Sequence, residues 1–184
     1  MARPVDHARR QELLDAAVDY AVANGLADLS LRPLAAALGT QAPVLLHHFG
    51  SKERLVALIV RAVRDRARSL GREAEAAEER TGLATVWAWA SDPAQRPFLR
   101  LFFEVYALAL RHPEQHREFL DAVVQDWLDE PMAAVDDVSA TIALAVINGL
   151  LLDLLATGDR SRVEAAMARV RAMLHAHADH VTGR

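Results

Sequence analysis

The sequence predicts an all-α protein, and three observations carry that prediction. Apolar residues recur at helical spacing along most of the 184 residues. Residues that favour helix starts and helix ends divide the chain into segments of ordinary helix length. No segment shows the sustained period-two alternation that is typical of a strand. About half of the residues are apolar (52%), which is enough to build a buried core.

The first elements predicted along the chain are a helix at residues 10–24 and a pair of short helices after it. Ser30 is a favourable N-cap for the first short helix, and Gly39 suits the left-handed position that ends it. Pro43 favours the first turn of a helix, and we expect the second short helix to span residues 44–49. Two short helices joined by such a turn form the helix-turn-helix geometry, which places its second helix in a DNA major groove.

The remaining elements are predicted from the same helix-start and helix-end residues. Ser51 caps a third helix, which we expect to continue to about residue 80. Asp92-Pro93 and His112-Pro113 each place a proline directly after a capping residue, where a missing N–H costs little. The patterns predict further helices at residues 82–90, 98–110, 114–128, 136–156 and 162–180.

The helix pair and the segment after it resemble the DNA-binding signature of the tetracycline-repressor (TetR) family. The matching residues are GTQAPVLLHHF at 39–49 and SKERL at 51–55. Leu46 stands where the family has a phosphate-binding tyrosine. The specific resemblance covers residues 10–55, and the rest of the chain matches only in length and helical layout.

The resemblance implies two domains and a function. We expect a three-helix DNA-binding domain at residues 1–50 and a helical ligand-binding and dimerisation domain at 51–184, with 51–80 as the connecting helix. The implied function is a ligand-responsive transcriptional regulator, usually a repressor, that binds a palindromic operator as a homodimer. Two rival interpretations are a small helical enzyme or carrier, and a protein-interaction module.

The distribution of charge is consistent with a nucleic-acid-binding N-terminal segment. The overall charge is −4, from 21 basic and 25 acidic residues. Residues 1–68 carry 10 Lys+Arg against 7 Asp+Glu (+3), and residues 69–184 carry 11 against 18 (−7). A basic patch supplies attraction to phosphates, although an excess of this size could also arise by chance.

The predicted DNA contacts lie around the second short helix. Gln41 can pair with an adenine edge, Pro43 and Val44 can touch a thymine methyl group, and Lys52 suits a phosphate. The resemblance adds an N-terminal arm with Arg3, which could instead be a solvated terminus. The full predicted set is Arg3, Ser30, Arg32, Gln41, Ala42, Pro43, Val44, His47 and Lys52.

The predicted effector site and dimer interface lie in the C-terminal domain. The resemblance implies an effector cavity. We select its candidates from the aromatic residues of this domain, because buried tryptophan and tyrosine carry polar handles that need partners, although such a set more often forms plain core. These candidates are Trp87, Phe102, Tyr106 and Trp127, together with Asn148, which could instead make an interhelical hydrogen bond. The helix at 136–156 is apolar almost all round, so it needs cover on more than one face. A second copy of the last two helices would supply that cover, unless this helix is simply the core of a monomer. The predicted interface is Ala145, Gly149, Leu151, Leu152, Met167, Val170 and Leu174.

Several classes of function lack support in the sequence. There is no cysteine, so disulfides and thiolate chemistry are excluded and a cytoplasmic location is expected. His112 and His116 have i,i+4 spacing, but no third ligand accompanies them, so we predict no metal and no cofactor. Residues 142–156 come closest to a membrane span, but polar residues interrupt them, and the N-terminus has no signal-peptide pattern.

Overall fold

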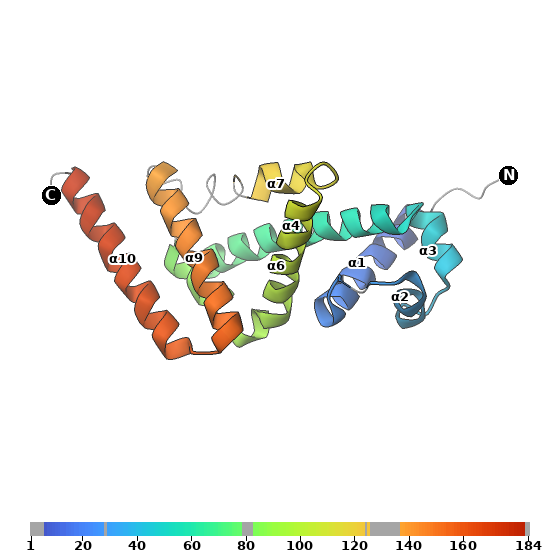
Figure 1. Ribbon diagram of the computed structural model, residues 1–184, viewed down its shortest axis with the longest axis horizontal. Helices are drawn as coiled ribbons and strands as arrows, with labels where there is room; N and C mark the ends of the chain where they lie inside the picture. Colours follow the sequence, from blue (N-terminus) through green and yellow to red (C-terminus); the bar gives the residue numbers. More distant parts are fainter. Residues whose placement is uncertain (1–5, 28, 79–82, 124, 126–136, 183–184) are drawn as a thin grey trace. The chain divides into compact units, whose positions relative to one another are not determined.

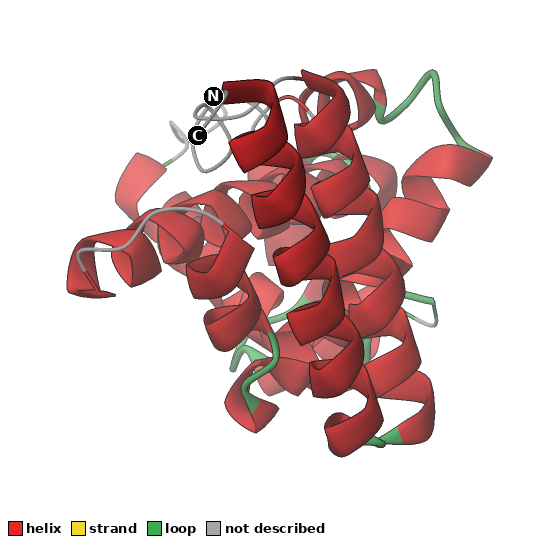
Figure 2. Ribbon diagram, turned by 90° about the vertical axis from the view of Figure 1, so that its left-hand side faces the viewer, coloured by secondary structure: helices red, strands yellow, loops and turns green. Residues whose placement is uncertain are grey.

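The structure is a computed structural model that describes residues 6–27, 29–78, 83–123, 125 and 137–182. Within these ranges every regular element is a helix, as the sequence predicts (Figures 1 and 2). The helices are α1 (His7–Asn24), α2 (Leu31–Ala37), α3 (Ala42–Phe49), α4 (Lys52–Glu78), α5 (Leu83–Ala90), the 3₁₀ helix η1 (Pro93–Gln95), α6 (Arg96–Arg111), α7 (Arg117–Val123), α9 (Asp137–Thr157) and α10 (Arg160–Thr182).

The chain forms two compact units that are not continuous in sequence. The first unit contains residues 1–67 and 97–121, and the second contains residues 68–96 and 122–184. The long helix α4 therefore contributes to both units. The predicted functional division at residue 50 is a different kind of boundary and stays a prediction.

The first unit is built on the apolar face of α1. Asp6 caps this helix, because its side chain accepts a hydrogen bond from the backbone N–H of Arg9 at 3.1 Å. Helices α1, α2 and α3 pack on one another. Their shared core continues into α4 and α6 and consists of fully buried side chains, among them Leu13, Leu34, Leu45, Leu55, Ile59 and Val105.

The second unit is organised around α9, which packs on α10 and on α5. Helices α9 and α10 run side by side and are joined by a short turn at Gly158 (Figures 1 and 2). Gly158 has φ +70°, in the left-handed region that favours glycine. The Arg160 guanidinium in the next turn donates a hydrogen bond to the Ser91 carbonyl oxygen, which ties α10 to the end of α5.

The observed bounds confirm most of the predicted helices and correct three details. Helix α3 begins at Ala42 rather than Val44, because Pro43 lies within its first turn. Residues 112–116 form a turn, in which the His116 N–H donates to the His112 carbonyl oxygen, so α7 begins only at Arg117. Ser30 is the N-cap residue of α2, but its side chain makes no capping hydrogen bond.

Candidate nucleic-acid interface

The turn between α2 and α3 is held by a hydrogen-bonding pattern that depends on Gly39. The Gly39 N–H donates to the Ala36 carbonyl oxygen at 3.2 Å, and the Thr40 N–H donates to the Ala35 carbonyl oxygen at 2.9 Å. This pair of bonds is a Schellman motif, which needs a left-handed residue at the glycine position. Gly39 has φ +63°, so the turn residue predicted from the sequence is confirmed.

Helix α3 has one buried face and one exposed face. Leu45 and Phe49, four residues apart, are buried and fasten the helix to the core. The opposite face exposes Val44 (37%) and Leu46 (41%) to solvent. Pro43, His47 and the N-cap Gln41 are exposed as well. Helix α3 thus presents a row of side chains that a ligand can reach, and it carries no charged residue of its own.

The start of α4 brings a cation next to α3. Ser51 caps α4, because its hydroxyl oxygen accepts a hydrogen bond from the Arg54 N–H at 3.2 Å. Lys52 is the sole lysine of the sequence, and it is exposed in the first turn of α4. Hydrogen bonds from the Glu53 backbone N–H and from Ser51 lower the pKa of Glu53, which therefore stays ionised at the helix N-terminus. Lys52 is exposed, so its ammonium group can reach a phosphate. The Glu53 carboxylate instead interacts favourably with the N-terminus of α4.

The C-terminal end of α3 is fixed by Arg10 of α1, a contact that the sequence analysis did not predict. The Arg10 Nε–H donates to the His48 carbonyl oxygen at 3.2 Å. The same guanidinium lies 5.5 Å from the ring centroid of Phe49. The His48 ring contacts the His47 ring edge-on, with the ring centroids 5.4 Å apart. The two histidines differ in exposure, since His47 is exposed and His48 is half-buried.

Two contacts missed by sequence reasoning tie α1 to α6 and α4. The Glu104 carboxylate of α6 accepts hydrogen bonds from the backbone N–H groups of Leu26 and Ala27, just after α1. The Arg66 guanidinium of α4 is paired with the Asp19 carboxylate of α1 at 3.0 Å. No local pattern could reveal Glu104, because its partners are backbone groups 77 and 78 residues away.

The remaining predicted contacts flank this surface. Ser30 and Arg32 are exposed at the start of α2. Ala42 is half-buried at the start of α3. Arg3 lies outside the described residues. The described candidates therefore lie at the start of α2, along α3 and at the start of α4, within the first unit, and their individual roles stay predictions.

Comparison with known proteins agrees with this geometry. The family of bacterial regulatory proteins, tetR family, matches residues 13–59, which extend from α1 into α4. Over residues 13–59 the chain is therefore similar to the proteins of this family. None of the curated proteins matches the sequence.

Solved structures with the same fold cover nearly the whole chain. The multidrug binding protein EbrR, solved in complex with imidazole and also with ethidium, has a TM-score of 0.71 in both structures. The imidazole complex is 24% identical in sequence, and the matched region covers 92% of this chain and 93% of the EbrR chain. A transcriptional regulator from Rhodococcus sp. Rha1 has a TM-score of 0.71, 20% identity and coverage of 90% and 95%. A TetR-family member from Streptomyces coelicolor A3 has a TM-score of 0.66, 23% identity and coverage of 88% and 97%. The chain therefore shares the fold of these proteins, one of them a TetR-family member, over about nine tenths of its length.

The structure divides the predicted effector residues between the two units. Phe102 and Tyr106 lie together in the first unit, where their ring centroids are 6.2 Å apart and Phe119 packs on both rings. Trp87 is buried in α5 of the second unit, and Asn148 is half-buried in α9. Trp127 lies outside the described residues. Among the described candidates, Phe102 and Tyr106 are thus neighbours, and their role in an effector site stays a prediction.

The predicted dimer residues separate into buried and exposed groups. Leu151 and Met167 are 4% and 2% exposed, so their own chain already encloses them. Leu174 packs against Ala140 and Ala143 of α9 within the chain. Ala145, Gly149 and Leu152 are exposed on α9, and Val170 is half-buried on α10. Any surface for a second copy must therefore use the exposed group.

Helix α9 is apolar enough to raise one further possibility. By length and composition alone, residues 138–157 could cross a membrane, with a mean hydropathy of 2.0. A core helix of a soluble protein passes the same test. Asp153 in this helix makes two 2.7 Å hydrogen bonds with the Arg162 guanidinium, which lower the pKa of Asp153.

Within the described ranges, no group of three or more His, Asp or Glu side chains could hold a metal ion.

Proposed function

We propose that this protein is a ligand-responsive transcriptional repressor that binds a palindromic operator as a homodimer. A small-molecule effector would release it from the DNA. The protein would act in the cytoplasm, because the operator DNA of a bacterial cell lies there. The proposal assigns no catalytic step.

The observation that carries this proposal is the exposed face of α3 beside Lys52. A rigid turn at Gly39 and the Arg10 bond to His48 hold the two ends of this helix. Gln41 can read a base edge, because no capping bond engages its side chain. Val44 supplies an apolar contact of the kind made with a thymine methyl group. Lys52 can neutralise a phosphate and set the register of the helix on the duplex.

Salt dependence of DNA binding tests the proposed function directly. Affinity for DNA from the promoter of its own gene should fall steeply with salt, because phosphate contacts release counterions. Lys52→Ala should weaken binding to every sequence alike and reduce the slope of log K against log salt by about one unit. Arg117→Ala removes a cation from exposed α7 and should leave that slope unchanged. A wild-type protein without salt-dependent binding would refute the proposal.

The single lysine permits an independent mapping of the interface. An amine-reactive reagent can label only Lys52 and the N-terminal amine, and mass spectrometry distinguishes the two peptides. Operator DNA should protect Lys52 from labelling, whereas random DNA at high salt should not. Equal labelling with and without operator would remove Lys52 from the interface.

The homodimer is supported by the exposed face of α9. Its exposed apolar residues recur at helical spacing: Val138, Ile142, Ala145, Gly149, Leu152 and Ala156. A stripe of this kind on a surface marks a protein contact, because water-exposed apolar patches are costly. Gly149 has no side chain, and a Cβ added there would meet nothing within 4 Å inside the chain. A second copy could therefore approach α9 closely at this point, with two-fold symmetry matching a palindromic operator.

The effector response is supported by the links between α1, α4 and α6. A change in α6 reaches the DNA-binding domain through Glu104, and a change in α4 reaches it through Arg66 and Asp19. The ligands seen in EbrR support an effector of small aromatic character. The aromatic cluster at Phe102 and Tyr106 is our candidate for one wall of its site. An effector changes operator affinity only if it binds the DNA-bound and free arrangements unequally.

A further inference from the structure

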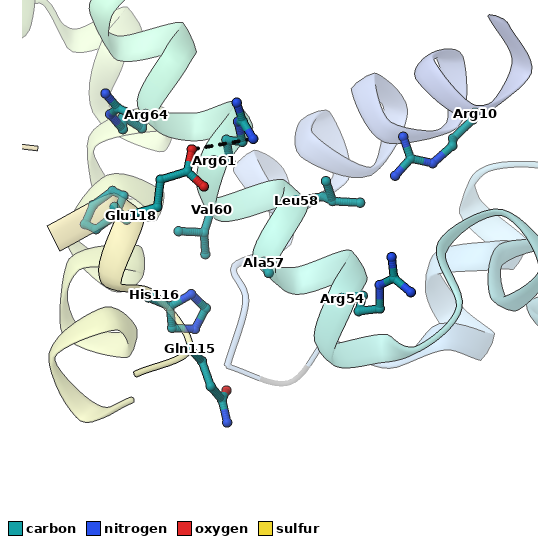
Figure 3. A pocket seen from close by; sticks show the side chains of 11 residues that line it. Arg10, Arg54, Ala57, Leu58, Val60, Arg61, Arg64, Gln115, His116 and Glu118 are labelled. Carbon is teal, nitrogen blue, oxygen red and sulfur yellow. Dashed lines mark ion pairs between the residues drawn. The ribbon is translucent and has the colours of Figure 1, made fainter. Parts of the chain in front are cut away.

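A cavity of about 240 Å³ in the first unit is lined by arginines and by an apolar floor (Figure 3). Its cationic residues come from α1 and α4, and its far wall comes from the turn before α7 and from α7 itself. The lining residues are Arg10, Arg54, Ala57, Leu58, Val60, Arg61, Arg64, Gln115, His116, Glu118 and Phe119. Figure 3 shows Arg10 and Arg54 extending toward one another from the two helices.

The charge of this lining is strongly positive. The lining contains four arginines and one carboxylate, so its formal charge is 4 − 1 = +3, and Arg64 has an interaction partner of its own. Glu118 is paired with Arg61 at 3.5 Å, and both side chains are exposed at the rim. In the part of the chain that the structure describes, the Arg54 guanidinium has no ion pair. Burial and the nearby His112 lower the pKa of His116, so this histidine is a neutral wall rather than a further cation.

The remaining donors and the floor define the chemistry of an occupant. Arg10 uses its Nε–H on the His48 carbonyl oxygen, and its terminal nitrogens face the cavity. Guanidinium groups bind carboxylates through two parallel N–H···O bonds. Ala57, Leu58 and Val60 supply an apolar surface next to these donors. The volume lies below the range of about 300–1,000 Å³ that is usual for drug-sized ligands, so an occupant must be small.

We propose that this cavity binds a small organic carboxylate with a compact apolar body, and that its occupancy lowers operator affinity. A cation of the ethidium type would be repelled here, so the site differs in ligand class from the effector site considered above. Arg10 and Arg54 also line a neighbouring cavity with His47 and His48 of α3. A bound anion would neutralise positive charge beside the DNA-facing helix and would compete for Arg10, which holds the end of α3. The effect on DNA rests on the proposed function, whereas binding of the anion does not.

A DNA phosphate is the competing occupant of these arginines. The wall formed by Phe119 and buried His116 favours a small molecule, because a phosphate group has no apolar part to place there.

Calorimetry without DNA distinguishes binding of a small carboxylate from binding of a DNA phosphate. At constant ionic strength, sodium benzoate should bind saturably, acetate should bind at least about tenfold more weakly, and uncharged benzamide should not bind. Equal binding of benzoate and benzamide, or no saturable benzoate binding, would overturn the proposal and leave the arginines to DNA.

Two variants locate the site. Arg54→Gln should reduce benzoate affinity about tenfold, the equivalent of one lost ion pair of about 1.4 kcal/mol. The matched control Arg117→Gln removes the same charge from α7 outside the cavity and should leave the affinity unchanged. Ala57→Phe fills the floor without changing the charge and should abolish binding, with circular dichroism used to verify folding. Unchanged benzoate binding in Arg54→Gln would refute the site, and this variant changes only an exposed side chain.

The regulatory effect has its own readout. Saturating benzoate should reduce operator affinity of the wild type about fivefold or more, the lower range of measured allosteric couplings. The same benzoate should leave the operator affinity of Ala57→Phe unchanged. A protein that binds benzoate but no promoter DNA would refute the proposed function and leave the carboxylate site standing. A protein that binds the operator equally with and without benzoate would refute the coupling.

Discussion

Helices α3 and α9 both expose apolar side chains, yet their surroundings differ. Val44 and Leu46 of α3 lie beside Lys52, which is exposed at the start of α4. Ile142 and Leu152 of α9 are about half exposed, and the stripe that contains them has no charged member. A comparable degree of exposure thus occurs next to a cation in one region and among uncharged residues in the other.

The difference teaches that exposure alone does not identify a partner. An apolar side chain next to a cation fits a nucleic acid, because phosphates and thymine methyl groups lie close together in the major groove. A continuous apolar stripe without charge fits another protein surface, where burial of apolar area drives association. Substitutions in the α9 stripe should therefore affect dimer formation, and substitutions around α3 should affect DNA binding.

Charge placed in the α9 stripe should dissociate the dimer. Ile142→Arg combined with Leu152→Arg introduces four buried charges into a two-fold interface, because each substitution occurs twice. Dimer affinity should fall by at least about 2 kcal/mol, roughly 30-fold, as for a central interface residue. Analytical ultracentrifugation measures the change. Leu110→Arg, at a more exposed apolar position of α6, should stay dimeric, and a dimeric double variant would contradict the interface.

Removal of the Gln41 side chain should impair sequence recognition. Gln41→Ala should lose about 1–3 kcal/mol on the preferred operator and little on random DNA, because a base contact is sequence-specific. Fluorescence anisotropy on both DNAs gives the comparison. Gln11→Ala, at an exposed position of α1, should behave like the wild type. If Gln41→Ala weakens both DNAs equally, then Gln41 does not read a base.

Alanine at the two left-handed turns should separate the functions of the two regions. Gly39→Ala and Gly158→Ala both place a Cβ in a left-handed conformation, which costs about 1–2 kcal/mol in the free energy of unfolding. Denaturant unfolding at one fixed protein concentration should show similar losses. Gly39→Ala should also weaken operator binding, since this turn orients α3. A loss of operator binding in folded, dimeric Gly158→Ala would argue against separate roles.

The smallest effect concerns pH and the buried His116. Burial holds the pKa of this histidine below its ordinary value of about 6.5. Below that pH the unfolded chain binds a proton that the folded chain does not, so the free energy of unfolding should fall as the pH falls. Thermal unfolding between about pH 8 and pH 5 should show a shallower decline in His116→Gln. His7→Gln, which changes an exposed histidine, should keep the decline of the wild type.

Sequence patterns could predict the local structure around the DNA-binding candidates better than the surroundings of the C-terminal candidates, for a physical reason. The turn at Gly39, the cap at Ser51 and the buried face of α3 depend on neighbours within a few residues, so local rules apply to them. Prediction of the effector site requires knowing which helices pack on one another, and local rules do not supply this. Phe102 and Tyr106 proved to be neighbours, whereas Trp87 belongs to the other compact unit.

The interface on α9 shows the same limit in another form. An all-apolar helix indicates that several faces need cover, but it does not indicate which face the chain itself covers. Leu151 and Leu152 are adjacent and equally apolar, yet the first is buried and the second is exposed. Packing of α5 and α10 on α9 makes that distinction.

The sequence by itself determined the helical class, the helix-turn-helix and the residues that α3 can offer to DNA, because these follow from spacing and from backbone preferences. Tertiary structure alone decided which residues hold that helix in place. Arg10 meets His48 across 38 residues, and Glu104 meets the end of α1 across 77 and 78. The tertiary structure also places Arg10, Arg54 and the turn before α7 around one cavity. Contacts between residues so distant in the chain depend on how helices pack, and no local pattern encodes that packing.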